Sequence, residues 1–187
     1  MGVEREMLLI TIPLSQEGWD EEKEEFVEPI YKTLCLEHSL VSLSKWESKW
    51  HKPFLSKVEK SYEEIIDYIK CMTVTKNVDP EVYNHITSEN MRQIDEYIEN
   101  PMTATTFSDD ESGKRNREII TSEIVYYWMI TLDIPFECQK WHLNRLLALI
   151  RVCNIKNSPK KKMSASSIMA RNAELNAARR KALNSKG

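Results

Sequence analysis

The stretch SLVSLSKWESKWHKP, residues 39–53, has the clearest helical pattern in the chain. Ser39 is a suitable N-cap, and Pro53 ends the pattern because proline cannot donate the next backbone hydrogen bond. The large apolar residues follow one another at intervals of three, three and four, as on one face of an α-helix: Leu40, Leu43, Trp46 and Trp50. The stretch therefore predicts a helix with both tryptophans on one face.

Capping signals predict three more helices between residues 61 and 101. A Ser or Thr followed three residues later by Glu satisfies two backbone donors at a helix start. Asp followed by Pro suits the same place, because Asp caps and Pro fits the first turn. The signals stand at Ser61 with Glu64, at Asp79 with Pro80, and at Thr87 or Ser88.

Two stronger helices are predicted after residues 103–116, whose composition is typical of an exposed loop. Residues 121–132 are apolar on most sides, so we expect this helix to be central in the fold. The next helix opens at Pro135 and runs to about Cys153.

The N-terminal region predicts a β-hairpin. Residues 7–12 are short, apolar and β-branched, and residues 26–36 partly alternate, with the acidic segment 17–25 between them. Pro29 suits an edge strand or the start of a strand. Because two strands are not stable alone, we expect the hairpin to lie on the helices.

The charge of the chain is divided between two segments. Residues 158–187 hold eight Lys or Arg and one Glu, a net charge of +7. Since the whole chain carries −3, residues 1–157 carry −10. We therefore expect an acidic helical body, residues 1–157, and a basic tail, residues 158–187.

The basic tail is composed of helix formers but has few large apolar residues. Its apolar stripe is too thin to fold into a core, so we expect a helix that forms on or against a partner. Three partners are open: phosphates, the acidic body of another copy, or an acidic or amphipathic helix. The tail lacks interleaved aromatic residues and the body is acidic, which disfavours nucleic acid.

Nothing in the sequence predicts catalysis, a cofactor or a metal. Cys35 and His38 form one loose pair, whereas a zinc site needs four converging ligands. We expect the four cysteines to be small core residues and His142 to lie at the core edge or on the surface. The chain contains no phosphate-binding glycine loop and no Gly-x-Ser-x-Gly motif.

The chain also lacks membrane signals. No apolar run reaches the roughly 18 residues that cross a bilayer, and the N-terminus has no signal-peptide pattern. We therefore expect a protein that stays inside the cell that makes it and does not bind a membrane.

The motif KWESKW, residues 45–50, has two interpretations. The tryptophans anchor the core, or they form a hot spot for a partner, because buried tryptophans often dominate interfaces. The candidate partner-binding residues combine this motif with the basic tail: Trp46, Trp50, Arg171, Arg179, Arg180 and Lys181.

Several segments resemble a group of tailed-phage proteins encoded in the tail-gene region of long-tailed (siphovirus-type) phages, the tail assembly chaperones. The likeness covers most of the chain and is carried by LEHSL at 36–40, SKWESKW at 44–50, PFL at 53–55, IPFEC at 134–138, KWHLNRL at 140–146, and residues 163–180.

The resemblance implies a non-enzymatic protein of the host cytoplasm that functions in virion assembly. Such chaperones bind the long, apolar, helical tape-measure protein and keep it soluble until the tail tube polymerises around it. Two other classes stay open: a structural virion component, such as a head–tail connector or neck protein, and a small nucleic-acid-binding protein that uses its basic tail. Self-association is a further possibility.

The fold expected from these patterns is mainly α, of the α+β class. An N-terminal β-hairpin packs on a bundle of about six helices, and a basic helical tail follows. The helical predictions rest on capping and periodicity, and the hairpin rests on two short strands.

Overall fold

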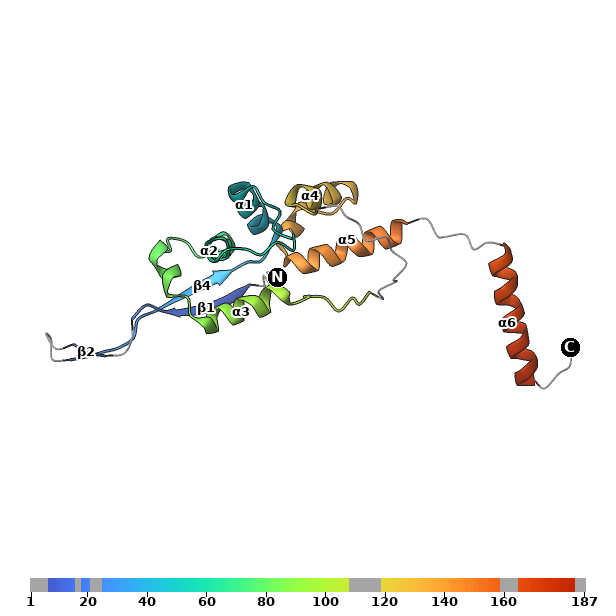
Figure 1. Cartoon of the computed structure of the whole chain (residues 1–187), viewed down its shortest axis with the longest axis horizontal. Coiled ribbons are helices and arrows are strands. Elements are labelled where there is room, and N and C mark those ends of the chain that lie inside the picture. Colours follow the sequence, from blue (N-terminus) through green and yellow to red (C-terminus); the bar gives the residue numbers. More distant parts are fainter. Residues whose placement is uncertain (1–6, 16–17, 21–24, 108–118, 159–164, 184–187) are drawn as a thin grey trace. The chain divides into compact units, whose positions relative to one another are not determined.

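The structure is a computed structural model that describes residues 7–15, 18–20, 25–107, 119–158 and 165–183. Within these residues the chain is α+β and mainly helical, as predicted, with an antiparallel hairpin at the N-terminus (Figure 1). The chain divides into two compact units, residues 1–154 and 155–187, and the division falls within the helix α5 (Leu143–Asn157).

The predicted N-terminal hairpin is present. The strands β1 (Leu8–Pro13) and β4 (Tyr31–Leu36) pair antiparallel, with Thr11 opposite Thr33. Alternation places the apolar side chains of one face in the core, because successive residues of a strand point to opposite sides. The buried members of this face are Ile10, Ile12, Leu34 and Leu36.

The predicted second strand, 26–36, is shorter than expected. β4 begins only after Pro29, while Phe26 and Val27 belong to the strand β3 (Glu25–Val27), which pairs with β2 (Gly18–Asp20). The acidic segment between the main strands is therefore partly a second antiparallel pair. Its remaining residues, 17 and 21–24, lie outside the described residues.

Three helices follow the predicted capping signals. Ser39, Ser61 and Thr87 each form a capping box at the start of α1 (Leu40–Trp50), α2 (Tyr62–Met72) and α3 (Ser88–Glu99). Asp79 caps the short 3₁₀ helix η1 (Pro80–His85). His51, in the left-handed region at φ 52°, ends α1 before Pro53 is reached.

The hairpin lies on these helices, as predicted. The Nδ2 group of Asn90 on α3 donates a hydrogen bond to the carbonyl of Thr11 at 3.0 Å. The chain after α2 pairs with the edge of β4, where the backbone N–H of Val74 donates to the carbonyl of Cys35 at 2.8 Å.

The later helices differ from prediction in one respect. α4 (Ser122–Thr131) is present, but the helix expected from Pro135 to Cys153 is broken into the 3₁₀ helix η2 (Phe136–Lys140) and α5. The break falls at Trp141 and His142. It lets the His142 ring bond the α3 backbone, and His142 Nδ1 accepts from the N–H of Asn144 in the first turn of α5 at 3.3 Å.

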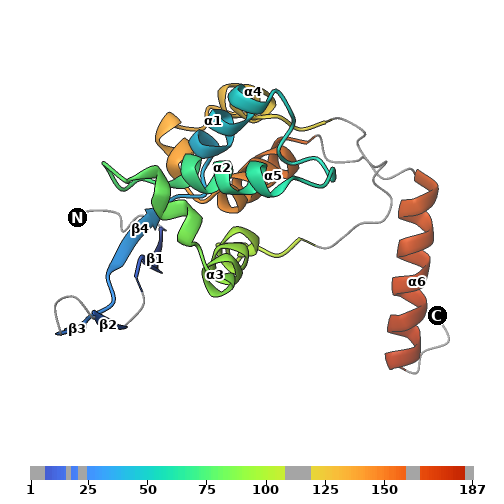
Figure 2. The ribbon, with the colours of Figure 1, turned by 60° about the vertical axis from the view of Figure 1, so that its left-hand side comes forward.

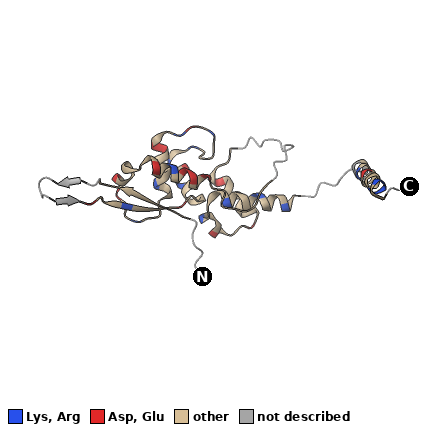
Figure 3. Ribbon diagram, turned by 90° about the horizontal axis from the view of Figure 1, so that it is seen from below, with Lys and Arg blue, Asp and Glu red and all other residues tan. Residues whose placement is uncertain are grey.

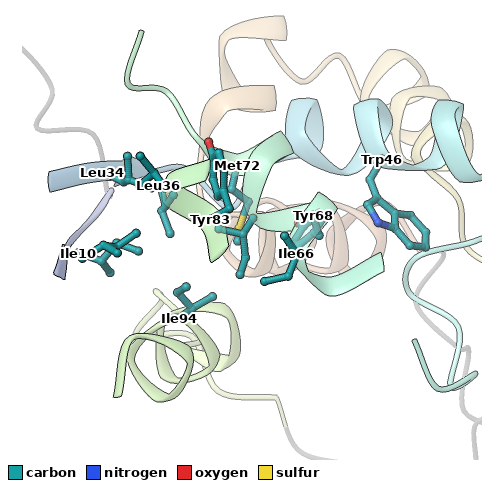
Figure 4. Close-up of a cluster of buried hydrophobic side chains, with 12 residues drawn as sticks. Ile10, Leu34, Leu36, Trp46, Ile66, Tyr68, Met72, Tyr83 and Ile94 are labelled. Carbon is teal, nitrogen blue, oxygen red and sulfur yellow. The ribbon is translucent and has the colours of Figure 1, made fainter. Parts of the chain in front are cut away.

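Two apolar cores share α1 between them. The first joins the hairpin to α1, α2, η1 and α3, and Figure 4 shows its side chains, among them Ile10, Leu34, Trp46, Met72 and Ile94. The second joins α1 to α4, η2 and α5, and its buried residues include Leu40, Leu43, Val125, Met129 and Leu146. Figure 2 shows α1 beside α4, where they contact each other.

Candidate partner-binding surface

The two tryptophans predicted to bind a partner differ in accessibility. Trp46 is fully buried in the first core, and its Nε1 group donates to the carbonyl of Glu64 at 2.8 Å. Trp50, one turn later, is half-buried and its Nε1 group donates to Asp67 at 2.9 Å. Trp46 is therefore a core anchor, and only Trp50 presents part of its ring to the surface.

Trp50 lines a groove between α1, α2 and η1. The groove has a volume of about 460 Å³. Tyr62 and Tyr83 contribute aromatic walls, and Asp67 accepts from both Trp50 and Lys49 inside it. Of the aromatic rings that line the groove, Tyr62 is exposed, Trp50 is half-buried and Tyr83 is buried.

The predicted basic residues lie on a different unit of the chain. Arg171, Arg179, Arg180 and Lys181 are all exposed on α6 (Ala165–Leu183), the helix of residues 155–187 (Figure 3). The structure thus distributes the six candidate residues over two units, with Trp46 and Trp50 on one and the basic residues on the other.

An exposed apolar face lies on α4, where the sequence predicted a central helix. That expectation was wrong. Val125 and Met129 are buried, but Tyr127 and Ile130 are 63% and 60% exposed. A helix that is apolar all round is normally buried, so the uncovered side of α4 is the candidate partner-binding surface of the body.

Phe136 of η2 is the next exposed large apolar side chain along the chain. It is 55% exposed and follows a tight turn in which Asp133 has a φ of 52° and Ile134 donates to the carbonyl of Met129 at 2.9 Å. We call Tyr127, Ile130 and Phe136 the α4 surface.

Residues 119–140 hold three acids and one base, Lys140, which is the last residue of η2. Glu123 lies one turn before Tyr127 on the same helix side, and Asp133 and Glu137 flank Phe136; all three acids are exposed. Hydrogen bonds from its own backbone N–H and from Thr121 lower the pKa of Glu123, so its carboxylate stays ionised. A partner for this surface should combine apolar and basic side chains.

The position of α4 depends on Glu47 of α1. Thr121 makes no side-chain capping hydrogen bond to α4, whereas Glu47 Oε2 accepts from the first backbone N–H of the helix, that of Ser122, at 2.7 Å. The other oxygen, Oε1, accepts from the N–H of Phe54 at 2.8 Å. One buried side chain of α1 thus caps α4 in place of a local residue.

Sequence analysis also missed a buried pair of histidines. His142, expected at the core edge or surface, is 1% exposed, and its ring lies 5.0 Å from that of His38 between centroids. His38 Nδ1 lies 2.7 Å from the Tyr68 hydroxyl, and His142 Nε2 lies 2.9 Å from the carbonyl of Tyr97. Burial, and then the neighbouring His142, lower the pKa of His38 to about 3, so its ring is neutral.

The histidine pair lies where segments of the two cores are hydrogen-bonded to each other. The Leu143 N–H donates to the carbonyl of His38 at 2.8 Å, which joins the start of α5 to the segment before α1. Of the cysteines, all within the described residues, Cys138 is buried and the other three are half-buried, and none forms a disulfide. Among the described residues, no group of three or more His, Cys, Asp or Glu side chains could hold a metal ion.

Comparison with known proteins identifies no matching family model, no matching curated protein and no matching solved structure. Within the described part of the chain, no helix combines the length and the apolar character that a membrane span requires.

Proposed function

We propose that this protein is a phage tail assembly chaperone whose α4 surface binds an apolar helical client, the tape-measure protein. The observation that carries the proposal is the exposure of Tyr127 and Ile130 on a helix with Glu123 as its only charged residue. The resemblance of segments such as residues 44–50 and 140–146 to tail assembly chaperones supplies the identity of the client.

The proposed activity follows from the physics of the client. A long apolar helix that waits for its tube aggregates through its exposed stripe. A small acidic protein that covers the stripe removes the apolar area from water and adds charge to the complex. The α4 surface would supply the apolar contact, and the acidic residues of the body would keep the complex soluble.

Co-expression with the tape-measure protein of the same phage tests the proposal. With the wild-type chain, we expect the tape-measure protein to be in the soluble fraction and to co-purify. The double variant Tyr127→Ser, Ile130→Ser, called the face variant, should leave the tape-measure protein insoluble because it removes the apolar contact. Both side chains are exposed, so the variant chain should still fold.

A matched control exists on the hairpin. Ile30 and Tyr31 are 59% and 58% exposed and belong to the same residue types, so the double variant Ile30→Ser, Tyr31→Ser removes the same side chains elsewhere. It should behave as the wild-type chain does. Equal insolubility of the tape-measure protein with and without the wild-type chain would refute the proposal.

The competing class, a structural virion component, would use the same surface but remain in the particle. Mass spectrometry of purified virions separates the two. A chaperone should be absent from the particle, and stoichiometric presence would favour a connector or neck protein.

A further inference from the structure

The helix α6 exposes apolar and basic side chains along the same side. Leu175, Arg179 and Leu183 follow at intervals of four, so they lie one above the other on the helix. Leu175 and Leu183 are exposed, and Arg179 and Arg180 stand between them. This stripe spans about 12 Å along the helix axis, at 1.5 Å per residue.

The α4 surface is similar in length and opposite in charge. Glu123, Tyr127 and Ile130 span about 10 Å along α4, and the exposed acids Asp133 and Glu137 lie beyond Ile130. Two leucines could cover Tyr127 and Ile130, while arginines between them meet the acids at the edge. Both stripes carry few large side chains, so their contact would be weak and reversible.

We propose that α6 of one copy binds the α4 surface of a second copy. The occupant follows from charge complementarity within the chain: α6 ends with Arg179, Arg180 and Lys181, and residues 119–140 hold three exposed acids against one base, Lys140. Because each copy offers one α6 and one α4 surface, the contact either closes reciprocally between two copies or continues from copy to copy into larger rings or open chains.

The inference goes beyond the proposed function and does not require it. If both hold, α6 and the client compete for the α4 surface, and α6 would keep that surface covered until a client binds. The stronger apolar contact of a long client helix would then displace α6. Self-association is measured without the tape-measure protein, so its outcome is separate from that of co-expression.

Two full-length variants that complement each other test the inference. The face variant, Tyr127→Ser with Ile130→Ser, keeps an intact α6. The tail variant, Arg179→Glu with Arg180→Glu, keeps an intact α4 surface. Substitutions at these exposed positions should leave the fold intact, which circular dichroism and thermal unfolding check.

The expected result is read by analytical ultracentrifugation over a range of concentrations. The wild-type chain and the Ile30→Ser, Tyr31→Ser control should self-associate, and added salt should weaken the contact. Each variant alone should associate at least about tenfold more weakly. An equimolar mixture should form a 1:1 heterodimer, because the face variant supplies α6 and the tail variant supplies the α4 surface.

Three outcomes would overturn the inference. A wild-type chain that is monomeric at all concentrations would exclude a contact between copies. This outcome includes the case in which α6 binds the α4 surface of its own chain. Undiminished association of either variant would place the contact elsewhere. A mixture that remains monomeric, although each variant is folded, would show that α6 and the α4 surface are not partners.

Discussion

Glu47 Oε2 accepts a hydrogen bond from the backbone N–H of Ser122 at 2.7 Å, so a residue of α1 caps a helix that begins far along the chain. The same carboxyl group accepts from the N–H of Phe54 through Oε1. These bonds join α1, the loop after it and α4, and they fix how α4 is presented. The first predictions concern this connection.

Removing the Glu47 side chain should destabilise the fold. Glu47→Ala leaves two backbone N–H groups without their acceptors, which costs about 1–3 kcal/mol per buried group. Glu47→Gln should cost less, since its amide oxygen still accepts from one of them. Urea unfolding followed by tryptophan fluorescence measures the loss.

The control for Glu47 is Glu59→Ala, which changes an exposed glutamate in the loop before α2. This variant should stay within about 0.5 kcal/mol of the wild-type chain. If Glu47→Ala is equally neutral, the account of how α4 is held is wrong.

The buried His38 should make stability depend on pH. The pKa of His38 is about 3 in the folded chain and 6.5 when it is exposed. Below pH 6.5 the unfolded chain therefore binds a proton that the folded chain does not. His38 therefore lowers the free energy of unfolding as the pH falls from 6.5 towards 3, by up to about 1.4 kcal/mol per pH unit.

Unfolding free energies between pH 7 and 5 test this dependence. His38→Gln should reduce the slope, whereas His85→Gln, at an exposed position on η1, should keep it. Carboxylates such as Glu64 and Glu89 titrate below this pH range, because their pKa values are lowered from the ordinary 4.5 by their basic partners. A slope unchanged by His38→Gln would contradict the assignment.

The two tryptophans should respond differently to truncation. Trp46→Phe reduces the buried ring and removes the indole N–H that donates to the carbonyl of Glu64, so we expect a loss of about 2–3 kcal/mol. Trp50→Phe should cost less than half of this, because Trp50 is only half-buried. Chemical denaturation of both variants provides the comparison, and equal losses would contradict the burial of Trp46.

Asn144 should connect α5 to the end of α3. Its Nδ2 group donates to the carbonyls of Ile98 and Asn100, both at 2.8 Å. Asn144→Ala should lower the unfolding free energy by about 1–3 kcal/mol, because both carbonyls lose a donor. Asn157→Ala at the exposed end of α5 is the control, and a loss at Asn144 no larger than that at Asn157 would contradict this role.

Sequence patterns predicted the elements that local signals determine. Ser39, Ser61 and Thr87 cap helices because their side chains reach N–H groups within the same turn, a property of a few adjacent residues. The hairpin was predicted from residues 7–12 and 26–36 because the alternation of apolar residues is also a local signal, and the pairing of β1 with β4 confirms it. The division of residues 26–36 between β3 and β4 depends on pairing partners, which alternation alone does not specify.

The features that involve distant residues could not be predicted. Residues 121–132 are apolar on most sides, and only the packing of α1 and α5 decides that Tyr127 and Ile130 remain exposed. The capping of α4 by Glu47 and the pairing of His38 with His142 join residues from different parts of the chain. No spacing rule connects them, so His142 was expected at the core edge or surface.

Amide hydrogen exchange of the full chain, with and without a soluble helical segment of the tape-measure protein, tests whether the α4 surface binds this client. Binding should slow exchange in α4 and η2, residues 122–140, and leave α3 unchanged, because the client covers the α4 surface. A segment that binds but slows exchange only elsewhere, or does not bind at all, would contradict the account.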